Sequence, residues 1–301
     1  MRGQGYDGAA VMSGAFRGVQ ALIRAEFPTA FYSHCSLHSS NLCLSDGSAV
    51  QAIKRAFGTI SDICSFFSAS PKRTALLKRH LEESSWSLCR LRYCETTWVE
   101  RHEAVSLLSE ALPQVVAALE DFMENSRDTT STATASALHH RVCSINFLLC
   151  LAVSERFLGL THHLSEYLQI TSVDMSVALE HVYLVLTKLE EMSANSEAEF
   201  NKIFDACEKS ANDFGATCEM PQVVGTQKYR ANPSASSARE YYRRATFSPY
   251  IDDLRATLER RFASHRSTLK RLQFVLTKNN VPKATSSLCS RHSNFTSKKC
   301  E

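Results

Sequence analysis

Apolar residues recur at helical spacing through the last two thirds of the chain. The repeat is clearest between residues 107 and 122, where apolar side chains fall at positions i, i+3, i+4 and i+7. This spacing lays one apolar stripe along a helix and predicts a helix there. The same pattern predicts helices over 147–168, 177–192, 200–214 and 241–262. We therefore expect this part of the chain to be an array of helices.

Polar or Pro-containing stretches at 125–136 and 220–237 break the helical pattern, and the first hundred residues follow a different one. Residues 126–136 are rich in Ser and Thr and lack large apolar side chains, so we expect a flexible loop. Five of the ten glycines lie within the first 18 positions. A short run at 30–34 predicts one strand, followed by helical stripes over about 38–46 and 50–67. This is an incomplete α/β unit, because a lone strand has no ladder partner.

Composition excludes several classes of protein. The chain has 301 residues, of which 44% are hydrophobic, and no apolar run approaches the ~20 residues that cross a bilayer. The first 11 residues are polar and glycine-rich, so we expect neither a secretory signal nor a membrane partner. Eleven cysteines, an odd number without a tight framework, indicate free thiols in a reducing compartment. We expect nuclear or cytoplasmic localisation.

The near-neutral net charge of +3 conceals two oppositely charged blocks. Residues 110–226 carry 17 acidic and 6 basic side chains, a net of −11. Residues 228–271 carry 11 basic and 4 acidic side chains, a net of +7. One interpretation is that the blocks are solvated helix faces that attract each other. The other is a phosphate-binding surface near the C-terminus, for which the candidates are Arg243, Arg244, Arg260 and Arg261.

Four stretches of sequence together resemble one family. They are GQGYDGAAVMSG at 3–14, HCSLHSSNLCL at 34–44, CETTWVERHEAV at 94–105 and YYRRATFSPYIDDLRATLERRF at 241–262. Their order and spacing are similar to those of the hAT superfamily of DNA transposases, particularly its domesticated relatives in zinc finger MYM-type and THAP-domain proteins. The resemblance extends over about residues 3–276.

The resemblance implies a ribonuclease H-like fold interrupted by an all-helical insertion. We therefore expect a mainly α chain with an incomplete ribonuclease H-like α/β corner. The expected organisation is a partial ribonuclease H-like region at 1–104, a helical insertion-like domain at 105–276 and a disordered tail at 277–301.

Family members carry an Asp, Asp, Glu triad that holds two divalent metal ions. Hard cations such as Mg²⁺ prefer oxygen ligands, and two ions ~4 Å apart can stabilise the attacking and leaving oxygens of phosphoryl transfer. Asp7 matches the second Asp of the triad. Without the resemblance, Asp7, which lies between Tyr6 and Gly8, is a plain turn residue. The resemblance leaves the other two carboxylates without a match, as in a chain truncated at both ends. We therefore expect no catalysis and no cofactor for this chain alone, although intact members use Mg²⁺.

Two further motifs supply candidate binding residues. Cys35 and His38 match the family's Cys-x-x-His motif, which is either half of a zinc site, a buried packing pair or a DNA-facing element. Trp98 matches a family Trp that can stack on an unpaired base, and Arg101 follows it on the same expected helix. Thr97 stands where the family usually has Arg. The alternative role for Trp98 is packing against the core.

The resemblance gives one leading functional hypothesis and two alternatives. The first is a truncated, catalytically inactive hAT transposase-like protein that keeps nucleic-acid or protein binding. The second is a subunit or fragment of an active metal-dependent DNA transposase or nuclease that missing sequence completes. The third is a helical protein-interaction module. Expected partners are DNA, other proteins or a related transposase-like chain.

Overall fold

Helices dominate the computed structural model of this chain, which describes residues 3–6, 9–34, 50–82, 98–168, 175–221, 233–260 and 262. The elements are, in order, β1 (Gly3–Tyr6), α1 (Ala10–Ser13), α2 (Val19–Glu26), β2 (Phe31–His34), α4 (Gln51–Ser68), α5 (Pro71–Glu82), α6 (Trp98–Glu110), α7 (Leu112–Asn125), α8 (Thr129–Val142), α9 (Ile145–Leu168), α10 (Met175–Ala194), α11 (Ser196–Asp213), α12 (Ala238–Tyr242) and a π-helical turn, η2 (Arg243–Phe247). The helix continues through 248–260. The mainly α fold is thereby confirmed.

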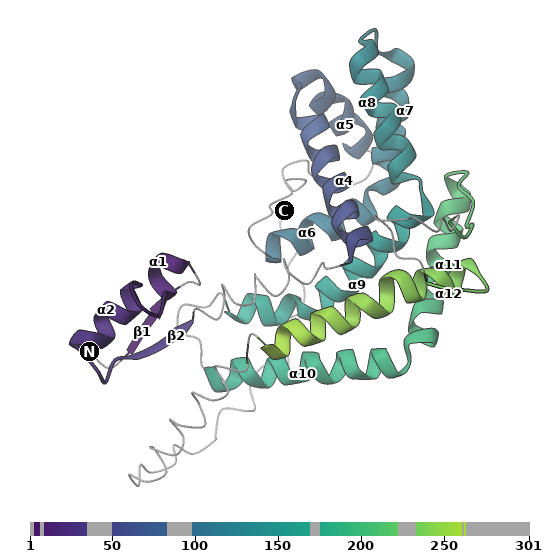
Figure 1. Cartoon of the computed structure of the whole chain (residues 1–301). Helices are drawn as coiled ribbons and strands as arrows, with labels where there is room; N and C mark the ends of the chain where they lie inside the picture. The colour runs from purple at the N-terminus through teal and green to yellow at the C-terminus, as the bar shows by residue number, and fades with distance from the viewer. Residues whose placement is uncertain are drawn as a thin grey trace, which may run out of the picture.

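The N-terminal elements form a small α/β unit (Figure 1). Strand β2 pairs in parallel with β1, with Tyr6 opposite His34. The expectation that strand 30–34 has no partner is therefore wrong. Its partner is glycine-rich, and glycine is depleted in strands, so the local sequence predicts that strand poorly. The ribonuclease H-like fold itself stays a prediction, because two paired strands do not define it.

The turn between α1 and α2 depends on glycine. A Cβ atom on Gly18 would lie 2.4 Å from the backbone nitrogen of Gly14, so no larger residue fits without a backbone shift. Beside this turn, the buried side chain of Gln4 in β1 donates a hydrogen bond from Nε2 to the carbonyl oxygen of Gln20 in α2 at 3.1 Å. This hydrogen bond connects β1 to α2, the helix that precedes β2.

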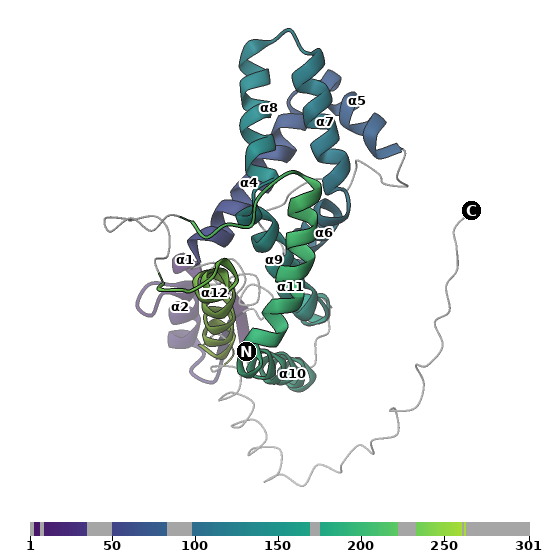
Figure 2. The same cartoon turned by 90° about the vertical axis from the view of Figure 1, so that its right-hand side faces the viewer.

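Helix α9 is the centre of the helical body. Its buried residues lie around most of its circumference, because α4, α6, α8, α10 and α11 all pack against it. Both views place α4, α5, α7 and α8 at one end of the body and α10 at the other (Figures 1 and 2). No single described helix is long and apolar enough to span a membrane, but α8 and α9, bent by 65° at their junction, pass that test as a pair.

The predicted boundary at residue 104 falls inside α6. Residues of α4 and α5 belong to the same buried cluster as those of the later helices, so the core is continuous across this position. The boundary at 276 and the tail at 277–301 lie outside the described residues, as does the helical stripe at 38–46.

Two local expectations about helices are wrong for identifiable reasons. The helix expected over 107–122 is broken into α6 and α7, because Pro113 in the first turn of α7 lacks the N–H that would continue α6. The loop expected at 126–136 is mostly α8. The Asp128 carboxylate caps this helix by accepting from the N–H groups of Thr130 and Ser131. Leu138 then anchors the helix in the core.

Candidate functional site

Asp7 and Cys35, which belong to two of the family motifs, each come directly after one of the two paired strands in the sequence. Asp7 comes after Tyr6, the last residue of β1, and Cys35 comes after His34, the last residue of β2. Because Tyr6 and His34 are opposite each other in a parallel pair, the chain leaves both strands at the same edge of the sheet. The carboxyl edge is where open α/β sheets bind ligands. Asp7, Cys35 and His38 themselves lie outside the described residues.

The third motif, at 94–105, includes the start of α6, and the side chains of Trp98 and Arg101 lie outside the described part of the chain. Trp98 is the first residue of α6 and Arg101 lies one turn further on. Next to Arg101, the half-buried imidazole of His102 stacks on His162 of α9, with ring centroids 4.3 Å apart. The Nδ1 atoms of both rings are buried and have no hydrogen-bond partner among the described residues. Burial, and then the charge of His162, lower the pKa of His102.

The pairing of these histidines was not predicted from the sequence, because they are 60 positions apart. His162 and His163 both contact the carboxylate of Glu166, at 3.3 Å and 3.5 Å. Among the described residues, no group of three or more His, Cys, Asp and Glu side chains is placed to hold a metal ion. The described part of α6 and α9 therefore offers a paired imidazole contact and no metal centre.

The basic segment is partly neutralised within the fold. Arg239 of α12 pairs with Asp205 of α11 at 2.6 Å, and its guanidinium lies 4.6 Å from the centre of the Phe204 ring. Arg244 pairs with Glu240 at 2.8 Å and donates to the carbonyl oxygen of Ser234. The acidic and basic blocks are therefore in contact here.

Two predicted nucleic-acid-binding residues have no acidic partner among the described residues. Arg243, half-buried in η2, donates to the Ser196 hydroxyl at 3.5 Å and forms no ion pair with a described residue, although its charge is one of the causes that lower the pKa of Glu240. Arg260 is exposed near the end of the last described helix. The side chain of Arg261 lies outside the described residues. Arg243 and Arg260 are therefore the described candidates for a phosphate contact.

Free thiols occur throughout the described core. Cys143, Cys150, Cys207 and Cys218 form no disulfide with any residue that the structure describes. Burial is the main cause that raises the pKa of Cys143 to about 11 and those of Cys150 and Cys207 to about 12. Since the thiolate is the nucleophile, these last three side chains are packing residues and not reactive groups.

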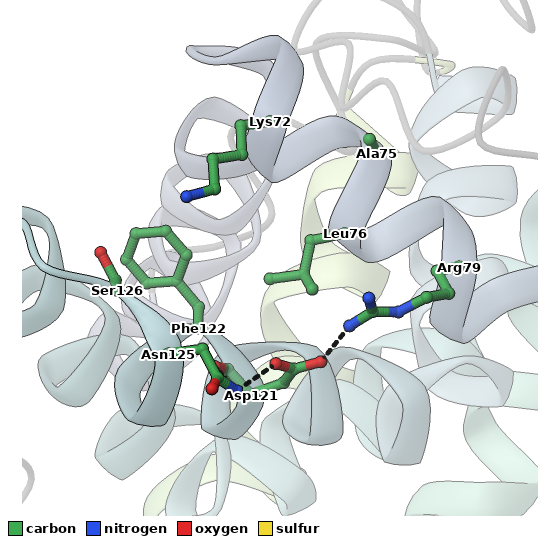
Figure 3. A pocket seen from close by; sticks show the side chains of 8 residues that line it. All are labelled: Lys72, Ala75, Leu76, Arg79, Asp121, Phe122, Asn125 and Ser126. Carbon is green, nitrogen blue, oxygen red and sulfur yellow. Dashed lines mark hydrogen bonds and ion pairs between the residues drawn. The ribbon is translucent and has the colours of Figure 1, made fainter.

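A cleft of about 500 Å³ lies between α5 and α7 (Figure 3). Its lining residues are Lys72, Ala75, Leu76 and Arg79 of α5, then Asp121, Phe122, Asn125 and the following Ser126. The α5 residues fall at i, i+3, i+4 and i+7 and so share one helix face. Sequence patterns did not identify this site, because its two sides are more than 40 positions apart.

One carboxylate in the cleft is held by three donors. Asp121 pairs with Arg79, contacts Nε2 of His80 at 2.9 Å and accepts from Nδ2 of Asn125 at 2.8 Å. The bond to His80, followed by that to Asn125, lowers the pKa of Asp121. Phe122 is fixed behind it by an edge-to-face contact with Phe66, with ring centroids 5.3 Å apart.

Comparisons with known proteins give distant similarity over almost the whole chain. The chain is 24% identical over 285 residues to the human (Homo sapiens) 52 kDa repressor of the inhibitor of the protein kinase, covering 91% of this chain and 37% of that protein. The Mus musculus protein of the same name is 24% identical over 286 residues, covering 91% and 38%. The chain thus spans under two fifths of these relatives. No family model and no solved structure matches it. The similarity fits a transposase-like chain.

Proposed function

We propose that this chain is a hAT transposase-like protein that binds nucleic acid or protein and does not cleave DNA by itself. The observation that supports the proposal is the pairing of the two strands that lead into Asp7 and Cys35. In sequence, each of these residues comes directly after one of two paired parallel strands, and the carboxyl ends of the two strands lie at the same edge of the sheet. The distant similarity to the two repressors covers 91% of the chain and fits the same relationship.

The absence of cleavage follows from the number of matched carboxylates. Asp7 is the one triad position that the motifs match in this sequence. A single carboxylate cannot hold the two metal ions that stabilise both the attacking and the leaving oxygen. Mg²⁺ would have to be held by Asp7 together with carboxylates from outside this sequence. The alternative proposal, a subunit or fragment of an active metal-dependent transposase or nuclease, requires that missing sequence to supply them.

A cleavage assay tests the catalytic part of the proposal. The purified chain is incubated with labelled duplex DNA and Mg²⁺ or Mn²⁺, and Asp7→Asn is the matched variant. We expect no cleavage or joining above the protein-free control for either chain. Metal-dependent cleavage that Asp7→Asn abolishes would overturn the proposal in favour of an active enzyme.

A binding assay tests the nucleic-acid part. Exposed Arg260, with Arg261 beside it in sequence, is the best candidate for a phosphate contact outside the internally paired arginines. We expect weak duplex binding whose log affinity falls with log salt by about 0.9 per phosphate contact. Arg260→Glu plus Arg261→Glu should abolish it. The matched control, Lys54→Glu plus Lys209→Glu, makes the same charge change on two exposed lysines elsewhere.

The outcome separates nucleic-acid binding from protein binding. Equal loss of affinity in both double variants would show that binding reflects net charge and not the basic segment. No binding at low salt would remove nucleic acid from the proposal and leave the helical protein-interaction module. Trp98→Ala and Arg101→Ala then test the third motif, where we expect weaker single-strand binding for both.

A further inference from the structure

The cleft between α5 and α7 contains one cation without a partner. Lys72 is exposed and makes no hydrogen bond or ion pair with any residue that the structure describes. Arg79, seven residues later and about 10 Å along the helix axis, is already paired with Asp121. Figure 3 shows Lys72 and Arg79 at the two ends of this face of α5, with Leu76 between them. The charge available to a ligand is therefore concentrated at the Lys72 end.

The rest of the cleft is apolar in its middle and carries unused polar atoms at its edge. Leu76 and Phe122 contribute apolar surface, and the small side chain of Ala75 also lines the cleft. The Asn125 side chain donates to Asp121, while its carbonyl oxygen has no partner among the described residues. The Ser126 hydroxyl accepts from the N–H of Asp128 and keeps its own proton for another acceptor.

These features define the chemistry of an occupant. It needs an anionic group for the Lys72 ammonium, an apolar side chain for Leu76 and Phe122, and an N–H group for the Asn125 carbonyl oxygen. A peptide with acidic and apolar side chains supplies all three. A nucleic-acid backbone supplies a negative charge at every nucleotide but no apolar group, and it would bring phosphates to the Asp121 carboxylate.

We propose that the cleft between α5 and α7 binds an acidic, apolar peptide segment of a partner protein, with a carboxylate on Lys72 and an apolar side chain between Leu76 and Phe122. The volume of about 500 Å³ is within the range of small-ligand sites. The hydrogen bonds to Asp121 and the packing of Phe122 on Phe66 already fix the side chains that line the cleft. Binding therefore costs little additional side-chain conformational entropy. This site does not depend on the proposed nucleic-acid function.

The test measures fluorescence anisotropy of a labelled peptide against the full chain. The probe is the acetylated heptapeptide Glu-Leu-Phe-Glu-Leu-Phe-Glu, and its counterpart carries Gln in place of each Glu. We expect saturable binding of the acidic peptide. The Gln peptide should bind with an affinity at least about tenfold lower, because it lacks the charge-assisted hydrogen bond to Lys72. Added salt should weaken the acidic peptide only.

Three variants locate the binding. Lys72→Glu should reduce affinity by about tenfold or more, whereas Lys54→Glu, the same change on an exposed lysine of α4, should change it less than about twofold. Ala75→Trp fills the cleft without changing charge and should also abolish binding. Circular dichroism of each variant confirms that it is folded.

Several results would overturn the proposal. They are no saturable binding at millimolar protein, equal losses for Lys72→Glu and Lys54→Glu, or full binding by Ala75→Trp. Equal affinity for the Glu and Gln peptides would show that no anion is recognised. Tighter, Lys72-dependent binding of a single-stranded oligonucleotide of matched length would assign the cleft to nucleic acid instead.

Discussion

Phe247 gives the sharpest test of how the C-terminal helix docks on the helical body. Its side chain is fully buried, and its ring centroid lies 5.7 Å from Phe157 of α9 and 5.3 Å from Phe200 of α11. Phe247→Ala removes a buried aromatic side chain and leaves a cavity, which costs about 3–5 kcal/mol. Net stabilities of about 5–15 kcal/mol are typical, so this one change should remove a large share of the free energy of unfolding.

Urea unfolding followed by circular dichroism measures the effect. The matched control is Phe16→Ala, since Phe16 is 94% exposed and its truncation should change the free energy of unfolding by less than about 0.5 kcal/mol. Phe247→Leu should fall between the two, because leucine fills part of the cavity. If Phe247→Ala costs less than about 1 kcal/mol, or no more than Phe16→Ala, the docking inferred for this helix is wrong.

Three further predictions concern backbone, thiols and protonation. Gly58→Ala should raise the free energy of unfolding by about 0.5–1 kcal/mol, because a Cβ there meets nothing within 4 Å. Gly215→Ala should lower the free energy of unfolding by about 1–2 kcal/mol, because φ of Gly215 is +69°, where a Cβ atom is strained. Thermal unfolding in which the Gly58 and Gly215 variants shift stability in the same direction would contradict these two predictions. Cys150 and Cys207 should react with a thiol reagent only as fast as the chain unfolds. Burial lowers the pKa of His102 from 6.5, so the unfolded state binds more protons below that pH. Stability should therefore fall as pH drops below about 6.5, and His102→Gln should weaken the fall.

Helices with a regular apolar repeat could be predicted from the sequence alone. The stripes at 147–168, 177–192 and 200–214 correspond closely to α9, α10 and α11, because apolar spacing reports directly which face is buried. Where the predicted helix bounds were wrong, a single residue was responsible in each case. Pro113 divides one predicted helix, and Asp128 starts a helix in a segment that is otherwise too polar to be recognised by its apolar pattern.

Some candidate site residues could be predicted from local sequence motifs, whereas others are brought together only by the tertiary fold. The positions of Asp7 and Cys35 come from short motifs, and the pairing of the strands before them was hidden by the glycines of β1. The α5–α7 cleft depends on two helices packing together. Neither Lys72 nor Asp121 has a local sequence pattern that distinguishes it from a solvated surface charge, so this site emerges only in the fold.

The contact between the acidic and basic blocks bears on what the chain can bind. Arg239 forms an ion pair with Asp205, and this pair neutralises part of the net positive charge of residues 228–271. Binding to an outside anion then depends on basic side chains that form no ion pair within the described part of the chain, and two of these are Arg260 and Lys72, which lie on different helices. A change at Arg260 should weaken DNA binding and leave the acidic peptide unaffected, while Lys72→Glu should do the reverse. Because each variant serves as the other's control, loss of both ligands from one variant would indicate a single nonspecific charge effect in place of two separate sites.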